Sequence, residues 1–294
     1  MTGDRAGGAL RGGAVVTGAG RGLGRQIAGL LVERGHTVLV TDLDEAAARQ
    51  AAEELGERAI AHRLDVRDAA AVDAARDLVV DRAGRLDVWV NNAGVLFSGP
   101  AWEQDADRRR LMLEVNALGT INGTVSAIDA MRRAGGGHVV NIVSLAGITA
   151  VPGEAVYAAS KHAAMGFSLS TLADLRLAGV KDVDISCVCP DGIWTPMLFD
   201  KLDDPDAALS FSGKLLQPEE VVAAVGRVLD RPRPVTTLPG WRGVAARLGD
   251  VVPALGLRLA PLLVQQGRRT QRKLAARPPR SDVAPAEPGP VPHH

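Results

Sequence analysis

The 294-residue chain has few cysteines and few aromatic side chains, and it carries no net charge. Its two cysteines, Cys187 and Cys189, are two residues apart on an expected strand, so they point the same way and cannot form an ordinary disulfide with each other. A net charge of zero gives no bulk attraction to nucleic acid. The glycine-rich, polar start does not resemble a signal peptide. We therefore expect a protein of the reducing cytoplasm that does not bind nucleic acid.

Long apolar runs and metal-ligand clusters are also missing from the sequence. No uninterrupted run reaches the roughly 20 apolar residues that a spanning helix needs. The histidines at 36, 62, 138 and 162 have no ligand spacing, and His293-His294 is too short a tract, so we expect no catalytic metal. Hydrophobic residues nevertheless make up 46% of the chain, which is ample for one large α/β core.

A glycine-rich turn joins the first expected strand, residues 14–17, to an expected helix that Gly35 ends. Glycines let the backbone approach a pyrophosphate, and the N-terminus of the helix provides oriented N–H groups. A strand, a glycine turn and a helix in this order predict a dinucleotide-binding loop. The expected contacts are Gly18, Arg21, Gly22, Leu23 and Gly24.

The next strand, residues 37–41, ends at Asp42. An acidic residue about 20 positions beyond the glycine loop can bind the ribose 2′-hydroxyl of NAD and would repel the 2′-phosphate of NADP. Arg21 is evidence in favour of NADP, since its cation could reach that phosphate. Leu43, the residue after Asp42, offers no such cation. We predict NAD, with NADP as the alternative cofactor. A second interpretation of Asp42 is the N-terminal cap of a helix over residues 44–55.

Strands and helices then alternate along the chain, which indicates a doubly wound parallel sheet of the Rossmann type with right-handed crossovers. Ligands in such sheets bind at the carboxyl ends of the strands. Asp65-Val66, residues 91–94 and Ser144 all stand at these ends. The expected strands are 59–64, 86–90, 138–143, 183–189 and 234–238, and the expected helices are 68–83, one long helix over 104–133, 154–178 and 218–230.

Tyr157 is the only tyrosine, and it stands four positions before Lys161. Residues four apart share one face of a helix. A nearby ammonium favours the phenolate, so this pair can act as an acid or a base near neutral pH. Ser144 could hydrogen-bond the substrate oxygen that exchanges a proton with Tyr157. Taken alone, the spacing also fits a half-buried Tyr beside a surface Lys.

Together these motifs resemble the short-chain dehydrogenase/reductase family over roughly residues 12–240. The resemblance implies an NAD(P)-dependent oxidoreductase in which Tyr157 is the acid/base and Lys161 lowers its pKa and binds the nicotinamide ribose. It implies that Ser144 holds the substrate oxygen and that Asn116 positions a water in a proton relay. The cofactor contacts that it implies are Asp65 and Val66 at the adenine, Ala93 and Gly94 at the adenosine ribose, and Thr195 at the carboxamide, with Asn91 and Asn92 shaping the end of the sheet near the cofactor.

One position departs from the family pattern. The family usually has Pro-Gly after the sixth strand, but here Asp191 follows Pro190, while Thr195 keeps its spacing. We expect Asp191 to form an Asx turn toward Ile193, or to repel acidic substrates. Residues 191–216 are expected to form a lid over the site. Their apolar side chains indicate either an apolar substrate body or packing beneath a loop.

Beyond the family core, residues 241–277 are expected to form a basic helical extension, with a disordered Pro-rich tail over 278–294 and a flexible N-terminus over 1–11. Residues 241–280 carry nine Arg or Lys and one acid. Their apolar residues form a stripe that Pro253 and Pro261 interrupt. Three interpretations are open: packing on the same domain or a sister subunit, contact with an anionic membrane surface, or disorder.

The sequence therefore predicts a single Rossmann-type domain with a helical C-terminal extension. Its expected activity is hydride transfer between a nicotinamide cofactor and a secondary alcohol or ketone with an apolar body. The alternatives are an NADPH-dependent ketoreductase of 3-oxoacyl type and a dinucleotide-binding sensor without turnover. The family resemblance implies a homodimer or homotetramer assembled through the helices over 104–133 and 154–178.

Overall fold

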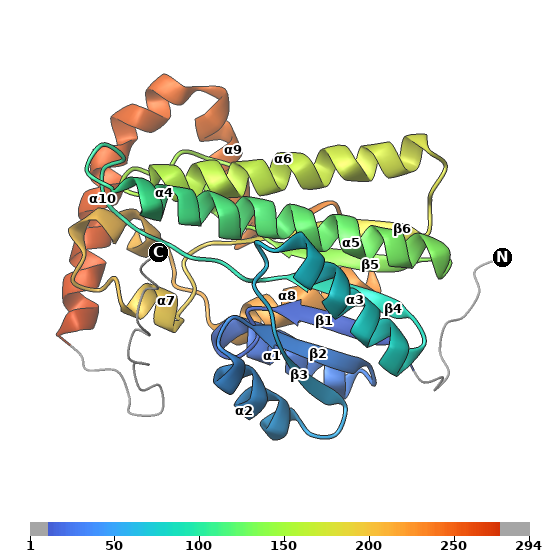
Figure 1. Cartoon of the computed structure of the whole chain (residues 1–294). Coiled ribbons are helices and arrows are strands. Elements are labelled where there is room, and N and C mark those ends of the chain that lie inside the picture. Colours follow the sequence, from blue (N-terminus) through green and yellow to red (C-terminus); the bar gives the residue numbers. More distant parts are fainter. Residues whose placement is uncertain (1–10, 277–294) are drawn as a thin grey trace.

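The computed structural model describes residues 11–276, and the expected tail over 278–294 and nearly all of the expected N-terminal segment lie outside them. Seven parallel strands form one sheet in the order β3-β2-β1-β4-β5-β6-β7. This doubly wound order confirms the predicted fold class (Figure 1). The strands are β1 Gly13–Thr17, β2 Thr37–Asp42, β3 Ala59–Arg63, β4 Leu86–Asn91, β5 Gly137–Ile142, β6 Val183–Pro190 and β7 Val235–Leu238.

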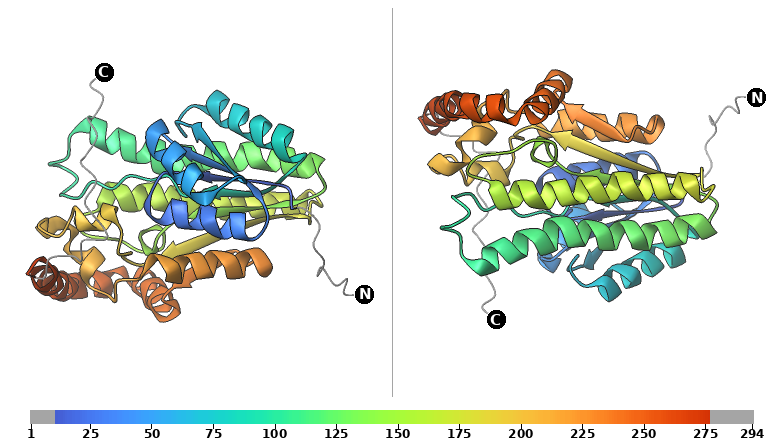
Figure 2. Two further views of the ribbon diagram at one scale, coloured as in Figure 1. Left: turned by 90° about the horizontal axis from the view of Figure 1, so that it is seen from below. Right: turned by 90° about the horizontal axis from the view of Figure 1, so that it is seen from above.

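Helices cover both faces of the sheet, so the strands are buried and read as apolar runs. One face packs against α1 Gly22–Glu33, α2 Glu45–Leu55 and α8 Pro218–Asp230. The other packs against α3 Ala69–Ala83, α5 Gly119–Arg133 and α6 Ala155–Leu177. Figure 2 shows the long α5 and α6 lying side by side over the second face.

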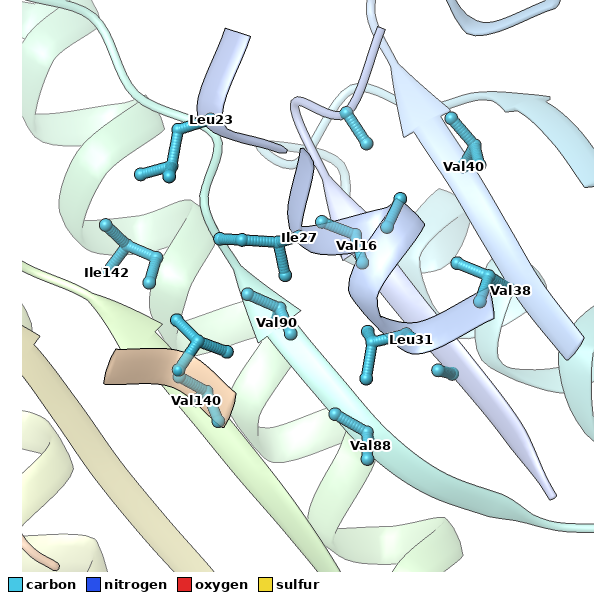
Figure 3. Close-up of a cluster of buried hydrophobic side chains, with 14 of the residues drawn as sticks. Val16, Leu23, Ile27, Leu31, Val38, Val40, Val88, Val90, Val140 and Ile142 are labelled. Atoms are coloured by element: carbon cyan, nitrogen blue, oxygen red, sulfur yellow. The ribbon is translucent and has the colours of Figure 1, made fainter. Parts of the chain in front are cut away.

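The core beneath α1 shows how the sequence pattern sets this packing. Leu23, Ile27 and Leu31 are four residues apart, so they project from one face of the helix toward the sheet. There they meet Val16 of β1 and Val90 of β4, and all five side chains are buried (Figure 3). This packing fixes the first turn of α1, and therefore the glycine loop before it, against the carboxyl ends of β1 and β4.

The long helix expected over residues 104–133 is present as one helical segment over residues 106–133, but it contains a π turn that was not predicted. α4 spans Ala106–Leu113, a π-helical turn follows over Glu114–Leu118, and α5 begins at Gly119. A π turn holds one residue more than an α turn and often marks a functional site. Asn116 lies within it.

The extension, residues 241–276 of the described chain, is helical rather than disordered. It forms α9 Gly240–Val251 and α10 Pro253–Ala275. Pro253 starts α10, where a missing N–H costs nothing, and Pro261 lies inside the helix. Leu274 of α10 packs against Leu198 and Phe211 of the lid, residues 191–216. The extension therefore packs on its own domain, at the carboxyl edge of the sheet (Figure 1).

Candidate active site

The glycine loop lies between β1 and α1 with its backbone turned toward a cavity. Gly18 and Gly22 have φ values of +61° and +56°, a conformation that side-chain-bearing residues rarely adopt. A Cβ at Gly24 would lie 2.2 Å from the Gly18 carbonyl oxygen and 2.5 Å from Asn92 Nδ2. At Gly22 an added Cβ would meet nothing within 4 Å, because that glycine faces open space. The loop thus has the close backbone packing and open N–H side that a pyrophosphate requires.

Side chains from β1 and β4 hold this loop in place. Asn92 Nδ2 donates to the carbonyl oxygens of Thr17 and Gly18, both at 2.9 Å. The Thr17 hydroxyl accepts from the backbone N–H groups of Asn92 and Ala93, at 3.0 and 3.1 Å. Asn92 therefore shapes the loop from behind, and this positioning leaves Ala93 and Gly94 at the cavity wall.

Asp42 lies at the end of β2 with one carboxylate oxygen on the glycine loop. Its Oδ2 accepts from the Gly20 N–H at 3.0 Å, and its Oδ1 accepts from the Asp44 N–H at 3.1 Å. The cap of α2 is Asp44, whose Oδ1 accepts from the N–H groups of Ala46 and Ala47. The alternative that Asp42 caps this helix is therefore wrong. Asp42 lines the cavity beside Leu43 and near Arg21.

The third strand delivers Asp65 and Val66 to the same cavity. Arg67 donates to both carboxylate oxygens of Asp65, with Nη2 2.6 Å from Oδ2, and these bonds hold the pKa of Asp65 below its usual value. The fixed carboxylate leaves its neighbour Val66 as an apolar contact at the cavity wall.

Asn116 is fully buried and is the one predicted site residue that does not line the cavity. Its Oδ1 accepts from the Val95 N–H at 2.8 Å, and its Nδ2 donates to the Val95 carbonyl oxygen at 2.9 Å and to Ser160 Oγ at 3.0 Å. The π turn changes the backbone bonding here, and the Asn116 carbonyl oxygen accepts from Thr120 Oγ1 at 2.8 Å. Asn116 thus ties the loop after β4 to α6, next to Lys161.

Ser144, Tyr157 and Lys161 meet at the carboxyl end of β5 and the first turns of α6. Burial and the charge of Glu154 raise the pKa of the Tyr157 phenol, and the Ser144 hydroxyl acts in the opposite direction with a smaller effect. Lys161 Nζ lies 5.7 Å from the Tyr157 ring centre and donates to the Ile142 carbonyl oxygen at 3.0 Å. Burial lowers the pKa of Lys161 to about 8, so the ammonium still dominates at neutral pH. The expected lowering of the Tyr157 pKa by Lys161 stays a prediction.

The lid closes on itself through a short parallel bridge. The Trp194 N–H donates to the Leu216 carbonyl oxygen at 2.8 Å, and the Leu216 N–H donates to the Gly192 carbonyl oxygen at 2.9 Å. Within the lid lie α7 Pro196–Phe199 and a 3₁₀ helix over Pro205–Phe211. Met197, Leu198 and Leu209 line the cavity together with Thr195.

The aromatic residues of the lid pack away from the cavity. Trp194 and Phe199 stack edge to face with ring centres 4.1 Å apart, and Phe211 is fully buried. None of these three residues lines the cavity. For the aromatics, packing beneath a loop is therefore the interpretation that fits, whereas the aliphatic side chains form the cavity wall.

Asp191 does not form the expected Asx turn toward Ile193. Its carboxylate Oδ2 lies 2.8 Å from Arg242 Nε in an ion pair that joins the lid to α9. The Asp191 side chain is only 9% exposed, and burial raises its pKa although the Arg242 charge opposes this. The Asp191 carboxylate is thus paired with Arg242, and both residues border the cavity.

All these elements border one cavity of about 2330 Å³, which runs from Asp42 and Asp65 past Tyr157 to the extension. Every predicted catalytic or cofactor residue except Asn116 lines it. Between residues 11 and 276, no group of three His, Cys, Asp or Glu side chains is arranged to hold a metal. Over the same span, no helix has the length and apolar character needed to cross a membrane.

The sequence pattern of the family described as short chain dehydrogenase matches residues 13–206. The chain belongs to this family. Short-chain dehydrogenases are oxidoreductases, which agrees with the predicted enzyme class. The match ends inside the lid, so the extension lies wholly outside it.

Individual short-chain dehydrogenases resemble the chain to different extents. It is 38% identical to the maize sex determination protein tasselseed-2 over 63% of this chain, and the match spans only 56% of that protein's length. It is 34% identical to cyclopentanol dehydrogenase of a Comamonas species over 72% of this chain and 86% of the relative. A short-chain dehydrogenase/reductase from Burkholderia phymatum, crystallised in complex with NAD, aligns with TM-score 0.75, 28% identity, and 84% and 96% coverage of the two chains.

One residue of this short-chain dehydrogenase site was missed by the sequence analysis. Glu154 is 2% exposed, lines the cavity three positions before Tyr157, and accepts a hydrogen bond from Ser210 Oγ at 2.6 Å. Burial raises its pKa to about 7. A lone acid in the apolar stretch before Tyr157 was the available signal, since such an acid has to be buried or paired.

Proposed function

We propose that the chain is an NAD-preferring dehydrogenase or reductase that acts on a secondary alcohol or ketone with an apolar body. The observation that carries this proposal is the common cavity: Ser144, Tyr157 and Lys161 border the same space as the glycine loop and Asp42. The glycine loop fits a dinucleotide, because its backbone is packed closely at Gly24, is open at Gly22 and borders the cavity.

The nicotinamide cofactor would supply the hydride acceptor or donor, and the residues of the chain would handle the oxygen and its proton. Tyr157 exchanges the proton with the substrate oxygen, which Ser144 holds by hydrogen bonding. Lys161, fixed by the Ile142 carbonyl oxygen, places its positive charge beside the phenol and favours the phenolate. Asn116 keeps Val95 and α6 in register around these groups.

Asp42 supports the preference for NAD. Its carboxylate borders the cavity at the end of β2 and is oriented by two backbone N–H groups. A ribose with free hydroxyls can donate to it, whereas a 2′-phosphate would meet a second negative charge. A neighbour crystallised with NAD is consistent with this choice.

The activity is tested by absorbance at 340 nm with NAD or NADP and a panel of hydrophobic secondary alcohols. We expect turnover with NAD that Tyr157→Phe abolishes, since the variant keeps the ring but lacks the exchangeable proton. NADH binding, followed by fluorescence, should survive this substitution. Binding of NADH without turnover of any alcohol or ketone would favour a dinucleotide-binding sensor instead.

The assembly that we expect is supported by exposed apolar side chains on α5 and α6. Val125 of α5 and Leu169 and Leu177 of α6 are 54%, 37% and 87% exposed, so these helices offer apolar area for a homodimer or homotetramer. Light scattering tests this assembly, and a monomer at micromolar concentration would contradict it. A cytoplasmic location remains part of the same proposal.

The membrane contact expected from the basic extension also stays a proposal. Trp241, Leu248 and Val251 are at least 65% exposed on α9, near Arg247. Exposed apolar side chains next to a basic residue suit binding to an anionic membrane surface. Co-sedimentation with anionic vesicles should fall for Val251→Glu, and equal pelleting of both proteins would contradict the contact.

A further inference from the structure

The substrate end of the cavity is built largely by residues beyond the family match. Past Tyr157 and the lid, the wall continues onto α9 and α10. Its members there are mostly small or aliphatic, and some of them, such as Leu257 and Leu259, are themselves exposed. The half-buried small ones are Ala246, Gly249, Gly256 and Ala260.

Arg242 fastens α9 to both ends of the lid. Its Nε pairs with Asp191 at the start of the lid at 2.8 Å, and its Nη2 donates to Ser212 Oγ near the other end at 3.3 Å. The fit is close, because a Cβ at Gly213 would lie 2.5 Å from Asp191 Oδ2 and 3.2 Å from Arg242 Cζ. Asp191, which departs from the family pattern, and Arg242, which lies outside the family match, thus form one joint between the lid and α9.

α10 holds the outer side of the same lid. A Cβ at Gly267 would lie only 1.7 Å from the Ala208 carbonyl oxygen, so the helix backbone rests on the lid backbone. The buried Gln271 donates to the carbonyl oxygens of Lys201 and Asp204, at 2.9 and 2.7 Å. Lid and extension therefore form a single wall.

We propose that this wall selects the substrate, and that the preferred substrate carries an alkyl chain reaching from Tyr157 to α9 and α10. Arg242 is the positioning residue that keeps α9 in place. The inference rests on the proposed function, since Tyr157 marks the reacting end. The wall continues along α9 and α10 beyond Tyr157, and its half-buried members there are small side chains. A longer chain would replace water along this apolar surface and gain affinity for each methylene that it buries.

Chain length is the variable that tests the wall. We expect the wild-type kcat/KM with NAD to rise from 2-butanol to 2-decanol, by up to about fourfold for each methylene fully buried. Ala246→Phe places a ring in the far part of the cavity, so it should lower the 2-decanol to 2-butanol ratio at least tenfold. Val244→Phe, on the exposed side of α9, is the matched control and should keep the wild-type ratio. The proposal would be overturned if the wild-type kcat/KM did not change with chain length, or if Ala246→Phe had the same 2-decanol to 2-butanol ratio as the wild type.

Calorimetry with 2-decanone and the protein–NADH complex separates this inference from the proposed function. Suppose that 2-decanone binds, that Ala246→Phe but not Val244→Phe weakens this binding, and that no alcohol is turned over. This result would reject the proposed activity but support the role of the wall in substrate binding. Turnover of small alcohols without tighter binding of 2-decanone would reject the wall and keep the activity.

The positioning role of Arg242 is tested by Arg242→Gln and Arg242→Lys. We expect Arg242→Gln to raise the KM for 2-decanol at least fivefold while kcat stays within twofold, because the polar contacts of Arg242 are to Asp191 and Ser212 and not to Tyr157 or Ser144. Arg242→Lys keeps the charge opposite Asp191 and should recover part of the loss. If kcat and the melting temperature fall in both variants together with the rise in the KM for 2-decanol, the role of Arg242 is merely structural and the assignment is refuted.

Discussion

Replacing Asp42 with alanine should shift the cofactor preference from NADH toward NADPH. In the wild-type chain the Asp42 carboxylate borders the cavity and also accepts from Gly20 N at 3.0 Å and Asp44 N at 3.1 Å. The substitution removes the acceptor for the ribose hydroxyls and the negative charge that opposes a 2′-phosphate. It also removes the support for the glycine loop, but both cofactors use that loop, so this loss cancels in their ratio.

The expected size of this shift follows from the lost hydrogen bond and the lost repulsion. A hydrogen bond to a charged group is worth about 1.5–3 kcal/mol net, which weakens NADH binding roughly 10- to 150-fold. Two charges about 4 Å apart in a solvated site repel by about 1 kcal/mol, which is roughly fivefold in favour of NADPH once Asp42 is gone. The ratio of the two dissociation constants should therefore change by at least about 50-fold.

Fluorescence titration with NADH and NADPH measures this ratio directly. Asp44→Ala is the matched control, because Asp44 caps α2 and does not line the cavity. That variant should lose about 1 kcal/mol of stability with no change in the ratio. An Asp42→Ala protein with the wild-type ratio would refute the assignment of Asp42 to the ribose.

Three further outcomes can be measured. Glu154→Gln removes a charge that raises the pKa of Tyr157, so the rise of kcat/KM for alcohol oxidation should move to lower pH, and an unshifted profile would contradict this. Asn91→Leu leaves the buried Trp89 Nε1–H without its acceptor at 2.8 Å and breaks a buried network, so urea unfolding should show a loss of about 2–5 kcal/mol; a loss under about 1 kcal/mol would count against it. Burial lowers the pKa of His138 to about 4, so between pH 6.5 and pH 4 the unfolded chain binds a proton that the folded chain does not. The free energy of unfolding should therefore fall by up to about 3 kcal/mol as the pH drops through this range. His138→Asn should flatten this pH dependence, and equal slopes for the two proteins would refute the assignment.

The strands and the glycine loop could be predicted from the sequence because their causes are local. Short apolar runs flanked by turns give buried parallel strands, and the seven expected strands agree with the structure to within a residue or two. The π turn at Asn116 could not be predicted, because its only signal in the sequence is a one-residue shift of the apolar periodicity. α4 has a single buried residue, Met112, and is therefore too polar to show that shift.

The parts of the site that escaped prediction depend on contacts between distant residues. Asp191 and Arg242 are 51 positions apart, and nothing near either residue in sequence indicates the other. Glu154 likewise meets its partner Ser210 only after the lid has folded over α6. Local patterns locate the residues at strand ends, whereas the tertiary fold decides which of the remaining polar groups become paired.

The π turn over residues 114–118 makes the length of this helical segment as important as its composition. Removing one residue there would restore an unbroken α-helix, which by local energetics alone is favourable. It would also rotate α4 by about 100° relative to α5. Leu111, which lines the cavity, would then face another direction, and Asn116 would leave Val95. A single-residue deletion should therefore be more damaging here than most substitutions, although no side chain with a chemical role is lost.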